Sequence, residues 1–337
     1  MSVITESIAD LSAALPGSGK LSEQRSAALA AFRQHGLPDT SNEDWRYTDI
    51  SSLDQARLAF RAPAQSAEAR IDLLPVDGDR IVFVNGQLDA TLTQIEAPKA
   101  AGISVLAADW SALHDGFPQN DDILAHPLGQ LNTATAQHGV LIRTPVGHDN
   151  TRTINIVLVN SAQSALALQP RIVLDLAERS SARVVLHFAS DAQVEGWMNA
   201  VVEIRQAAGS RLTLLQLQEH SATQTHTVLI SGALERDACA SVGSFDLGAR
   251  LARNDIDIRL DGPGSEVEVF GTFLPMQAQH IDTHLRIDHA APHTRSVASF
   301  RGIAGKSSRG VFNGKVIVRE GAQKISAEQR SDNLLLS

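Results

Sequence analysis

The sequence predicts a mainly β protein, in which a long C-terminal body of short strands follows a helical and mixed α/β N-terminal region. Two observations support this prediction. From residue 139 onward, β-branched runs alternate with turns of small or polar residues, and the strand–turn–strand units recur at intervals of roughly 25 to 30 residues. Within these runs, apolar and polar residues alternate with a period of two, which is typical of a strand with one buried face.

The turns between paired strands are recognisable by their composition. They read AERSSAR (177–183), QAAGSR (206–211), RDACAS (236–241), DGPGSE (261–266), HAAPHT (289–294) and EGAQK (320–324). A strand with one apolar face cannot bury that face alone, so stacked neighbours must supply the core. The pattern by itself fits a solenoid of stacked repeats and a face-to-face β-sandwich equally well, and both interpretations remain open at this point.

The N-terminal region, residues 1–138, begins with a predicted helix over residues 22–34. Ser22 is the candidate N-cap of this helix, and Gly36 is a stop signal just beyond its last residue. These signals, together with the good helix formers between them, favour a helix over this segment.

Two strands and a second helix are predicted before the β body. The runs IVFVNG (81–86) and ISVLA (103–107) have the β-branched and apolar content of strands. Residues 121–139 read as a helix that is interrupted or kinked near Pro127, because proline removes a helical hydrogen bond. The body, residues 139–337, follows directly.

Composition excludes several classes of function. The net charge of -9 disfavours a nucleic-acid partner, since phosphate binding depends on Lys and Arg. Cys239 is the single cysteine, so no intramolecular disulfide forms and the chain alone cannot supply a four-cysteine cluster site. The N-terminus lacks the basic start and apolar run of a signal peptide, and no stretch reaches the length of a membrane span. We therefore expect a cytoplasmic protein with no membrane contact.

The densest polar group lies in QHIDTHLRIDHAAPHT (279–294). On a strand, His280, Asp282 and His284 share one face, and His280 and His284 then lie roughly 13 Å apart, too far to bind one ion. Only neighbours two residues apart remain plausible metal ligands. The favoured interpretation is a hydrogen-bonded polar ladder on a solvent-facing or partner-facing sheet, and a metal site that uses His280, Asp282 or His284 is the alternative.

Other candidate sites are weaker. PGSGKLS (16–22) lacks the first glycine and the Ser or Thr of a phosphate loop, so a nucleotide site is rejected. DGPGSE is interpreted as a turn. Cys239 is expected to be an unreactive small residue within a turn. Trp45 and Tyr47 are interpreted as an aromatic anchor that ties the N-terminal region to the body, and a binding patch is the alternative.

Three segments resemble the SufD branch of the SufB/SufD family. They are NEDWRYTDIS (42–51), VFVNG (82–86) and the stretch from His280 to Ser337, which carries the His-rich strand, GVFNGK and NLLLS in order. The resemblance spans almost the whole chain. It implies a right-handed parallel β-helix core at 139–337, preceded by the helical and mixed α/β region, and so favours the solenoid over the sandwich.

The resemblance also implies a role. Family members are scaffold subunits that pair through the ends of their β-helices, here with SufB, and that bind the ATPase SufC in a complex that assembles iron–sulfur clusters. No catalytic residue and no resident cofactor are expected in this chain, and a cluster would be held only transiently in the full complex. The family pattern continues beyond position 337 with a SufC-binding helical region, so a C-terminally truncated form that does not bind SufC is expected.

Two other functions remain as alternatives. A carbohydrate-active β-helix enzyme would need paired carboxylates and aromatic platforms, and only 4% of the residues are aromatic. An adaptor solenoid without metal chemistry would present the same repeats. In either case an unpartnered sheet edge favours a homodimer when the chain is isolated.

Overall fold

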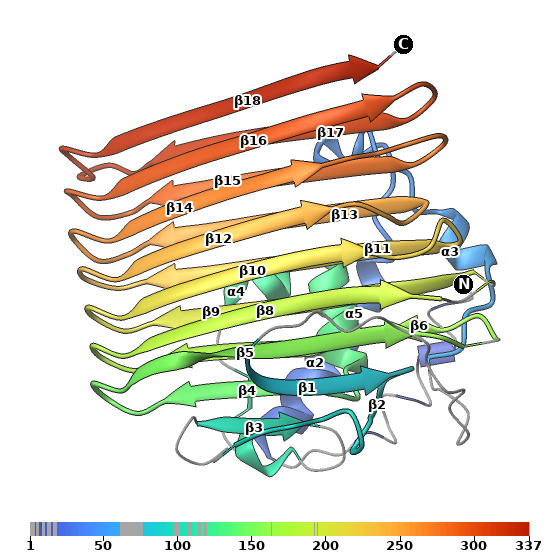
Figure 1. Ribbon diagram of the computed structural model, residues 1–337, viewed down its shortest axis with the longest axis horizontal. Helices are drawn as coiled ribbons and strands as arrows, with labels where there is room; N and C mark the ends of the chain where they lie inside the picture. The colour runs from blue at the N-terminus through green and yellow to red at the C-terminus, as the bar shows by residue number, and fades with distance from the viewer. Residues whose placement is uncertain are drawn as a thin grey trace.

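The C-terminal body is a parallel β-helix of about seven turns over residues 139–336, which confirms the solenoid and not the sandwich (Figure 1). The computed structural model describes residues 4, 7–8, 11, 15, 19–60, 77–96, 102–106, 110–113, 116–117, 120–162, 164–191, 193 and 195–336. Each turn of the β-helix contributes one strand to each of two sheets. The six turns that composition predicts join β7 to β8, β9 to β10, β11 to β12, β13 to β14, β15 to β16 and β17 to β18.

We call the two sheets the open sheet and the covered sheet. The strands of the open sheet, in chain order, are β1 (Gly78–Val84), β2 (Gln87–Leu88), β5 (Asp149–Asn160), β8 (Ser181–Ser190), β10 (Arg211–Glu219), β12 (Cys239–Asp246), β14 (Glu266–Phe273), β16 (Arg295–Gly305) and β18 (Ser326–Leu336). Those of the covered sheet are β3 (Ile103–Leu106), β4 (Gly139–Thr144), β6 (Ala167–Leu168), β7 (Arg171–Leu176), β9 (Gly196–Gln206), β11 (Gln224–Leu234), β13 (Leu251–Leu260), β15 (His280–His289) and β17 (Arg309–Val318).

Pairing within the β-helix is parallel throughout, because each strand pairs with the equivalent strand of the next turn. The predicted strands near residues 81–86 and 103–107 are β1 and β3. They extend the two sheets at the N-terminal end, β1 in parallel with β5 and β3 antiparallel to β4. The N-terminal region therefore supplies the first strands of both sheets.

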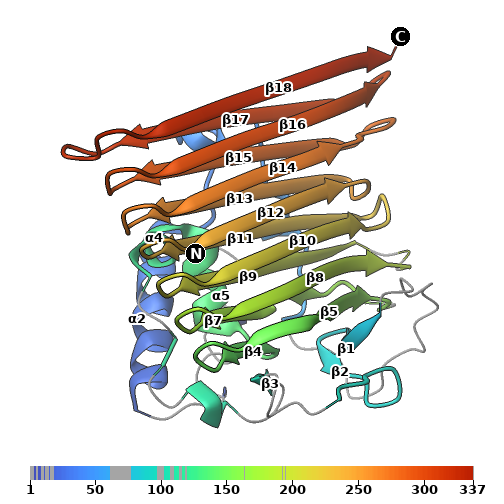
Figure 2. The same cartoon turned by 60° about the vertical axis from the view of Figure 1, so that its left-hand side comes forward.

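The core lies between the two sheets and consists of the aliphatic residues that the period of two predicts, such as Val242, Ile256 and Val269. The outer face of the open sheet is partly exposed, as predicted. The covered sheet differs, because β9 and β11 are buried on both faces. Helices contact these two strands from outside, and Figure 2 shows the helices gathered on one side of the stack. The expectation of one buried and one exposed face is therefore wrong for β9 and β11, whereas Asp255 to Leu260 on β13 alternate as predicted.

Both predicted helical segments are present, but their termini differ: the first extends from residue 20 to 35, and the second ends at Thr135 and not at residue 139, where β4 begins. They are α2 (Lys20–His35), α3 (Ser52–Gln55), α4 (Asp121–Ala125) and α5 (Pro127–Thr135), with short 3-10 helices η1 (Glu43–Trp45) and η2 (Ser111–Leu113). Ser22 is not the N-cap of α2, because the helix begins two residues earlier after Gly19. Gly36 ends α2 with φ 69°, and Pro127 separates α4 from α5, both as predicted.

The tight turns that join the two sheets stack closely on one another, and glycine is required where the backbones of successive turns meet. A Cβ at Gly262, in the turn between β13 and β14, would overlap backbone atoms of Glu235 and Arg236 in the preceding turn. We expect Gly262→Ala to lower the free energy of unfolding by about 3 kcal/mol, because the two turns must move apart. In Gly147→Ala the backbone has φ 66° but the added Cβ meets no atom within 4 Å, so a loss of about 1 kcal/mol is expected. Urea unfolding of both variants measures the difference, and equal losses would contradict close stacking.

Candidate functional site

A segment of the N-terminal region, residues 42–56, lies across the outer face of the covered sheet and carries η1 and α3. Trp45 is buried, and its ring stacks 4.0 Å from the guanidinium carbon of Arg253 on β13. The cation–π contact and the burial make Trp45 the anchor that the sequence predicts. Tyr47 is 47% exposed, and its ring lies 5.6 Å from the guanidinium carbon of Arg309 on β17. Both aromatic residues therefore contact the body, Trp45 as a buried anchor and Tyr47 at the surface.

Arg253 is the centre of a buried ion-pair network beneath this segment. It is 1% exposed and donates to Asp282 Oδ2 at 2.9 Å, to Asp255 Oδ1 at 2.7 Å and to the backbone oxygen of Asp44 at 2.7 Å. The side chain of Asp282 is fully buried. The guanidinium is therefore held by the fully buried carboxylate of Asp282, by the carboxylate of Asp255, which is 15% exposed, and by a backbone oxygen of the N-terminal segment.

The structure brings the three candidate metal ligands, His280, Asp282 and His284, onto one face of β15. Thr48 Oγ1 contacts His280 Nε2 at 3.1 Å and donates to Asp282, and His284 Nε2 lies 3.2 Å from Asp282 Oδ1. Burial alone raises the pKa of the Asp282 carboxyl, but the contacts from His284, Arg253 and Thr48 outweigh burial and hold the pKa below its ordinary value. Within the described part of the chain, no three or more His, Cys, Asp or Glu side chains are arranged to hold a metal ion.

The polar ladder on β15 is therefore real, but its predicted environment is wrong. The face is neither open to solvent nor free for a partner near Asp282, because the chain's own N-terminal segment covers it. The physical reason is that a buried carboxylate must be paired with a positive charge and hydrogen-bond donors. Asp282 needs the Arg253 guanidinium and the Thr48 hydroxyl, which lie on separate elements and meet only in the folded protein.

A second buried ion pair fixes α5 to the covered sheet. Arg171 Nη2 lies 2.5 Å from Glu203 Oε2, and its other terminal nitrogen donates to Thr133 on α5. Both charged side chains are at most 2% exposed. Burial raises the pKa of Glu203 despite the opposing charge of Arg171. The charged groups of Arg171 and Glu203 are thus used to position structural elements.

The interior of the β-helix contains a polar cluster that the sequence analysis did not predict. Its members are Gln216 on β10, Ser244 and Asp246 on β12, Asn254 on β13 and Thr283 on β15, and all are at most 2% exposed. Asp246 Oδ2 accepts from Ser244 Oγ and Asn254 Nδ2, both at 2.8 Å. Burial raises the pKa of Asp246 to about 6, although those hydrogen bonds act in the opposite direction.

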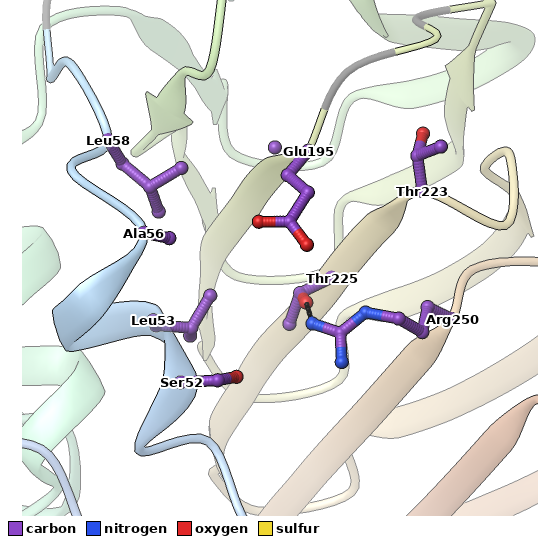
Figure 3. Close-up of a pocket in the computed structure, with 9 residues that line it drawn as sticks. Ser52, Leu53, Ala56, Leu58, Glu195, Thr223, Thr225 and Arg250 are labelled. Carbon is purple, nitrogen blue, oxygen red and sulfur yellow. Dashed lines mark hydrogen bonds between the residues drawn. The ribbon is translucent and has the colours of Figure 1, made fainter.

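A small surface pocket of about 60 Å³ lies where α3 meets the loops at one end of the stack (Figure 3). Glu195 and Arg250 come from different loops and point toward the same space, and Leu53 and Leu58 form an apolar wall. Arg250 is held by a hydrogen bond to Thr225 Oγ1 at 3.1 Å. The pocket is large enough for a few water molecules or a very small ligand.

Cys239 is the first residue of β12 and not part of the preceding turn as predicted. Its side chain is half-buried, and burial raises the pKa of the thiol above its ordinary value. A raised pKa leaves little thiolate at neutral pH, and the thiolate is the reactive form.

The C-terminal end of the β-helix presents unpaired strand edges. Among the described residues, no strand pairs with the outer edge of β17 or β18. Leu334, Leu335 and Leu336 on β18 are 55%, 79% and 44% exposed, and Val318 on β17 is 52% exposed. Exposed aliphatic side chains beside free backbone donors and acceptors form a surface suited to strand addition.

No helix in the described ranges is both long and apolar enough to cross a bilayer.

Comparison with protein families identifies the group to which this architecture belongs. The model described as SUF system FeS cluster assembly, SufBD core domain, matches residues 157–337, and the model of the SufBD protein N-terminal region matches residues 12–156. The core model alone covers more than half of the 337 residues. The chain belongs to the SufBD family. The resemblance that the sequence suggested is confirmed at this level.

Individual SufBD relatives are similar over most of the chain. The chain is 26% identical over 321 residues to the iron-sulfur cluster assembly protein SufD of Escherichia coli (strain K12), a match that covers 94% of this chain and 74% of that protein. It is 23% identical over 339 residues to a SufBD family protein of Synechocystis sp., with the same two shares. It is 25% identical over 170 residues to the chloroplastic protein ABCI7 of Arabidopsis thaliana, which covers 50% of this chain and 36% of that protein.

Proposed function

We propose that this SufBD-family chain is a non-catalytic scaffold subunit of the SufD type in the cytoplasm. It pairs with a SufB-type paralogue in a complex that also contains the SufC-type ATPase, and this complex builds iron–sulfur clusters that the chain does not retain. The similarity to SufD of Escherichia coli supports the subunit type. We assign the pairing surface to β17 and β18, whose outer edges have no strand partner among the described residues and carry exposed aliphatic side chains.

The geometry of β18 indicates which backbone groups are available to a partner strand. Ser326 N–H donates to Thr294 O, and Leu336 O accepts from Lys306 N–H, so even-numbered residues of β18 direct their backbone toward β16. Because backbone direction alternates along a strand, the N–H and C=O groups of residues 327, 329, 331, 333 and 335 face the free edge. A SufB-type strand can therefore add to the sheet through these groups.

The charged side chains support a scaffold more than an enzyme. Arg171 with Glu203, and Arg253 with Asp282, are buried in ion pairs that attach the helices and the N-terminal segment to the β-helix. These groups hold structure together and are not directed at a substrate.

Co-purification tests the pairing. Tagged chain is expressed with the SufB-type and SufC-type proteins of the same organism, and the SufB-type protein is expected in the eluate. Ser331→Pro removes one N–H at the free edge and is expected to lower the recovery of the SufB-type subunit about tenfold, as the loss of a central backbone hydrogen bond predicts. Ser331→Ala keeps that N–H and is expected to behave as the unmodified chain. Absence of the SufB-type protein from the eluate of the unmodified chain would refute the proposal. Equal recovery of the SufB-type protein with both variants would refute the edge of β18 as the pairing surface.

A further inference from the structure

Charge is distributed unevenly along this chain. Residues 295–337, which we call the basic end, contain eight Lys and Arg but three Asp and Glu, a net charge of +5. Because the whole chain carries -9, residues 1–294 carry -14. The basic end forms β16, β17 and β18 with their connections, which are the last strands of the stack in Figure 1. The positive charge is therefore concentrated at the end of the β-helix that carries the free edges.

The basic side chains of this end are exposed, and most of them have no acidic partner. All eight lie at the surface. Arg319 and Arg330 form ion pairs with Asp288 and Asp332. In the part of the chain that the structure describes, the other six form no ion pair: Arg295, Arg301, Lys306, Arg309, Lys315 and Lys324. Six positive charges are thus available to a partner.

The free edges do not by themselves choose between partners. Their unpaired backbone groups and exposed aliphatic side chains, such as Leu335 and Val318, fit a second copy of this chain as well as a paralogue. In a symmetric pair of identical chains, the same patch meets itself. Two basic ends would then face each other, and like charges across an interface cost binding free energy, whereas acidic side chains on a partner add to it.

We propose that the basic end excludes a second copy of this chain from the edges of β17 and β18 and selects a partner edge rich in Asp and Glu. This inference rests on the pairing proposed above and adds the chemistry of the partner. The aliphatic side chains provide contact area for any strand, and the charges decide which strand binds. The attraction acts over a Debye length of about 10 Å at 0.1 M salt, so it also guides the partner toward this end.

Sedimentation equilibrium of the 337-residue chain tests the exclusion. Self-association is expected to be about tenfold tighter in roughly 500 mM than in roughly 50 mM sodium chloride, because salt screens the repulsion. The triple variant Lys306→Gln, Lys315→Gln, Lys324→Gln lowers the charge of the basic end from +5 to +2. It is expected to self-associate about tenfold more tightly than the unmodified chain at the lower salt concentration.

A matched control separates the position of the charges from their number. The variant Lys20→Gln, Arg33→Gln, Arg236→Gln removes three positive charges from exposed positions outside the basic end. It is expected to self-associate as the unmodified chain does. The exclusion is overturned if self-association of the unmodified chain is absent or equal at both salt concentrations, or if the two variants associate equally.

Capture of the SufB-type protein at the lower salt concentration tests the selection. The triple variant of the basic end is expected to capture about tenfold less than the unmodified chain and the control. Equal capture by all three leaves the pairing in place and refutes selection by charge. Absence of capture by the unmodified chain refutes the proposed function, while the sedimentation result still tests the exclusion. A labelled single-stranded oligonucleotide that binds the unmodified chain but not the triple variant would assign the basic end to nucleic acid and overturn the proposal.

Discussion

Replacement of Arg253 by alanine is expected to lower the free energy of unfolding by about 3–5 kcal/mol, because a buried ion pair loses one partner. The side chains of Arg253 and Asp282 are 1% and 0% exposed. Without the guanidinium, the carboxylates of Asp282 and Asp255 remain in a dry environment, and Trp45 loses its cation–π partner. We also expect residues 42–56 to detach from the covered sheet, since the Arg253 bond to Asp44 O is lost.

Urea unfolding measures the stability, and limited proteolysis near Trp45 measures the release of the segment. Arg143→Ala is the matched control, because Arg143 forms a 3.0 Å ion pair with Asp175 in the same sheet but is 53% exposed. An exposed pair contributes about 0–1 kcal/mol, so the control should unfold almost as the unmodified chain does. A loss from Arg253→Ala no larger than that of Arg143→Ala would show that the buried network does not hold the segment.

The fold class was predictable because the two signals that define it are local. Period-two alternation, as in Ile256 to Leu260, and turns such as DGPGSE each depend on a few consecutive residues. The choice between solenoid and sandwich was not predictable from the pattern, because both folds use the same strands and turns. They differ in which strands pair, and β13 pairs with β11 and β15, which are not its neighbours in the chain. The family resemblance provided that information.

The polar ladder on β15 was predictable as a group of residues but not in its role. The density of His and Asp between His280 and His284 is visible in the sequence, yet the partners of Asp282 lie far away. Arg253 is 29 positions earlier and Thr48 is 234 positions earlier. No local pattern indicates that residues 42–56 cover this face. For the same reason the burial of Arg171 and Glu203 was missed.

The interior polar cluster did leave a signal in the sequence. Val242 is a core residue, and side chains two and four positions later point to the same side of a strand. The alternation therefore places Ser244 and Asp246 in the core, and the same rule places Gln216 there after Leu214. A polar residue at a position reserved for the core indicates a functional or satisfied polar site.

Acid is expected to destabilise the β-helix through two further interior residues, His220 and His226. Their rings lie 5.2 Å apart beside Phe188, and both imidazoles are buried. Burial lowers the pKa of His220 to about 3 and lowers the pKa of His226 well below 6.5, the ordinary value. Below pH 6.5 the two histidines therefore bind protons in the unfolded chain but stay neutral in the folded chain. The stability that is present above pH 6.5 is lost as the pH falls toward the pKa values of these histidines in the folded chain.

Each of the two histidines is expected to cost about 1.6 kcal/mol of stability between pH 6.5 and pH 5, because one pH unit corresponds to about 1.4 kcal/mol per bound proton and the unfolded imidazole is only half protonated at pH 6.5. Urea unfolding at both pH values compares the unmodified chain with the double variant His220→Leu, His226→Leu, which should lose about 3 kcal/mol less over this interval. Buried carboxyls such as Asp246 titrate in both proteins and cancel in the comparison. His293→Leu changes an exposed imidazole that is in water before and after unfolding, so its pH dependence should equal that of the unmodified chain. The prediction is contradicted if the free energy of unfolding depends on pH in the same way for the double variant and for the unmodified chain. That result would mean that both imidazoles accept protons inside the fold, and hence that water reaches the interior of the β-helix beside Phe188.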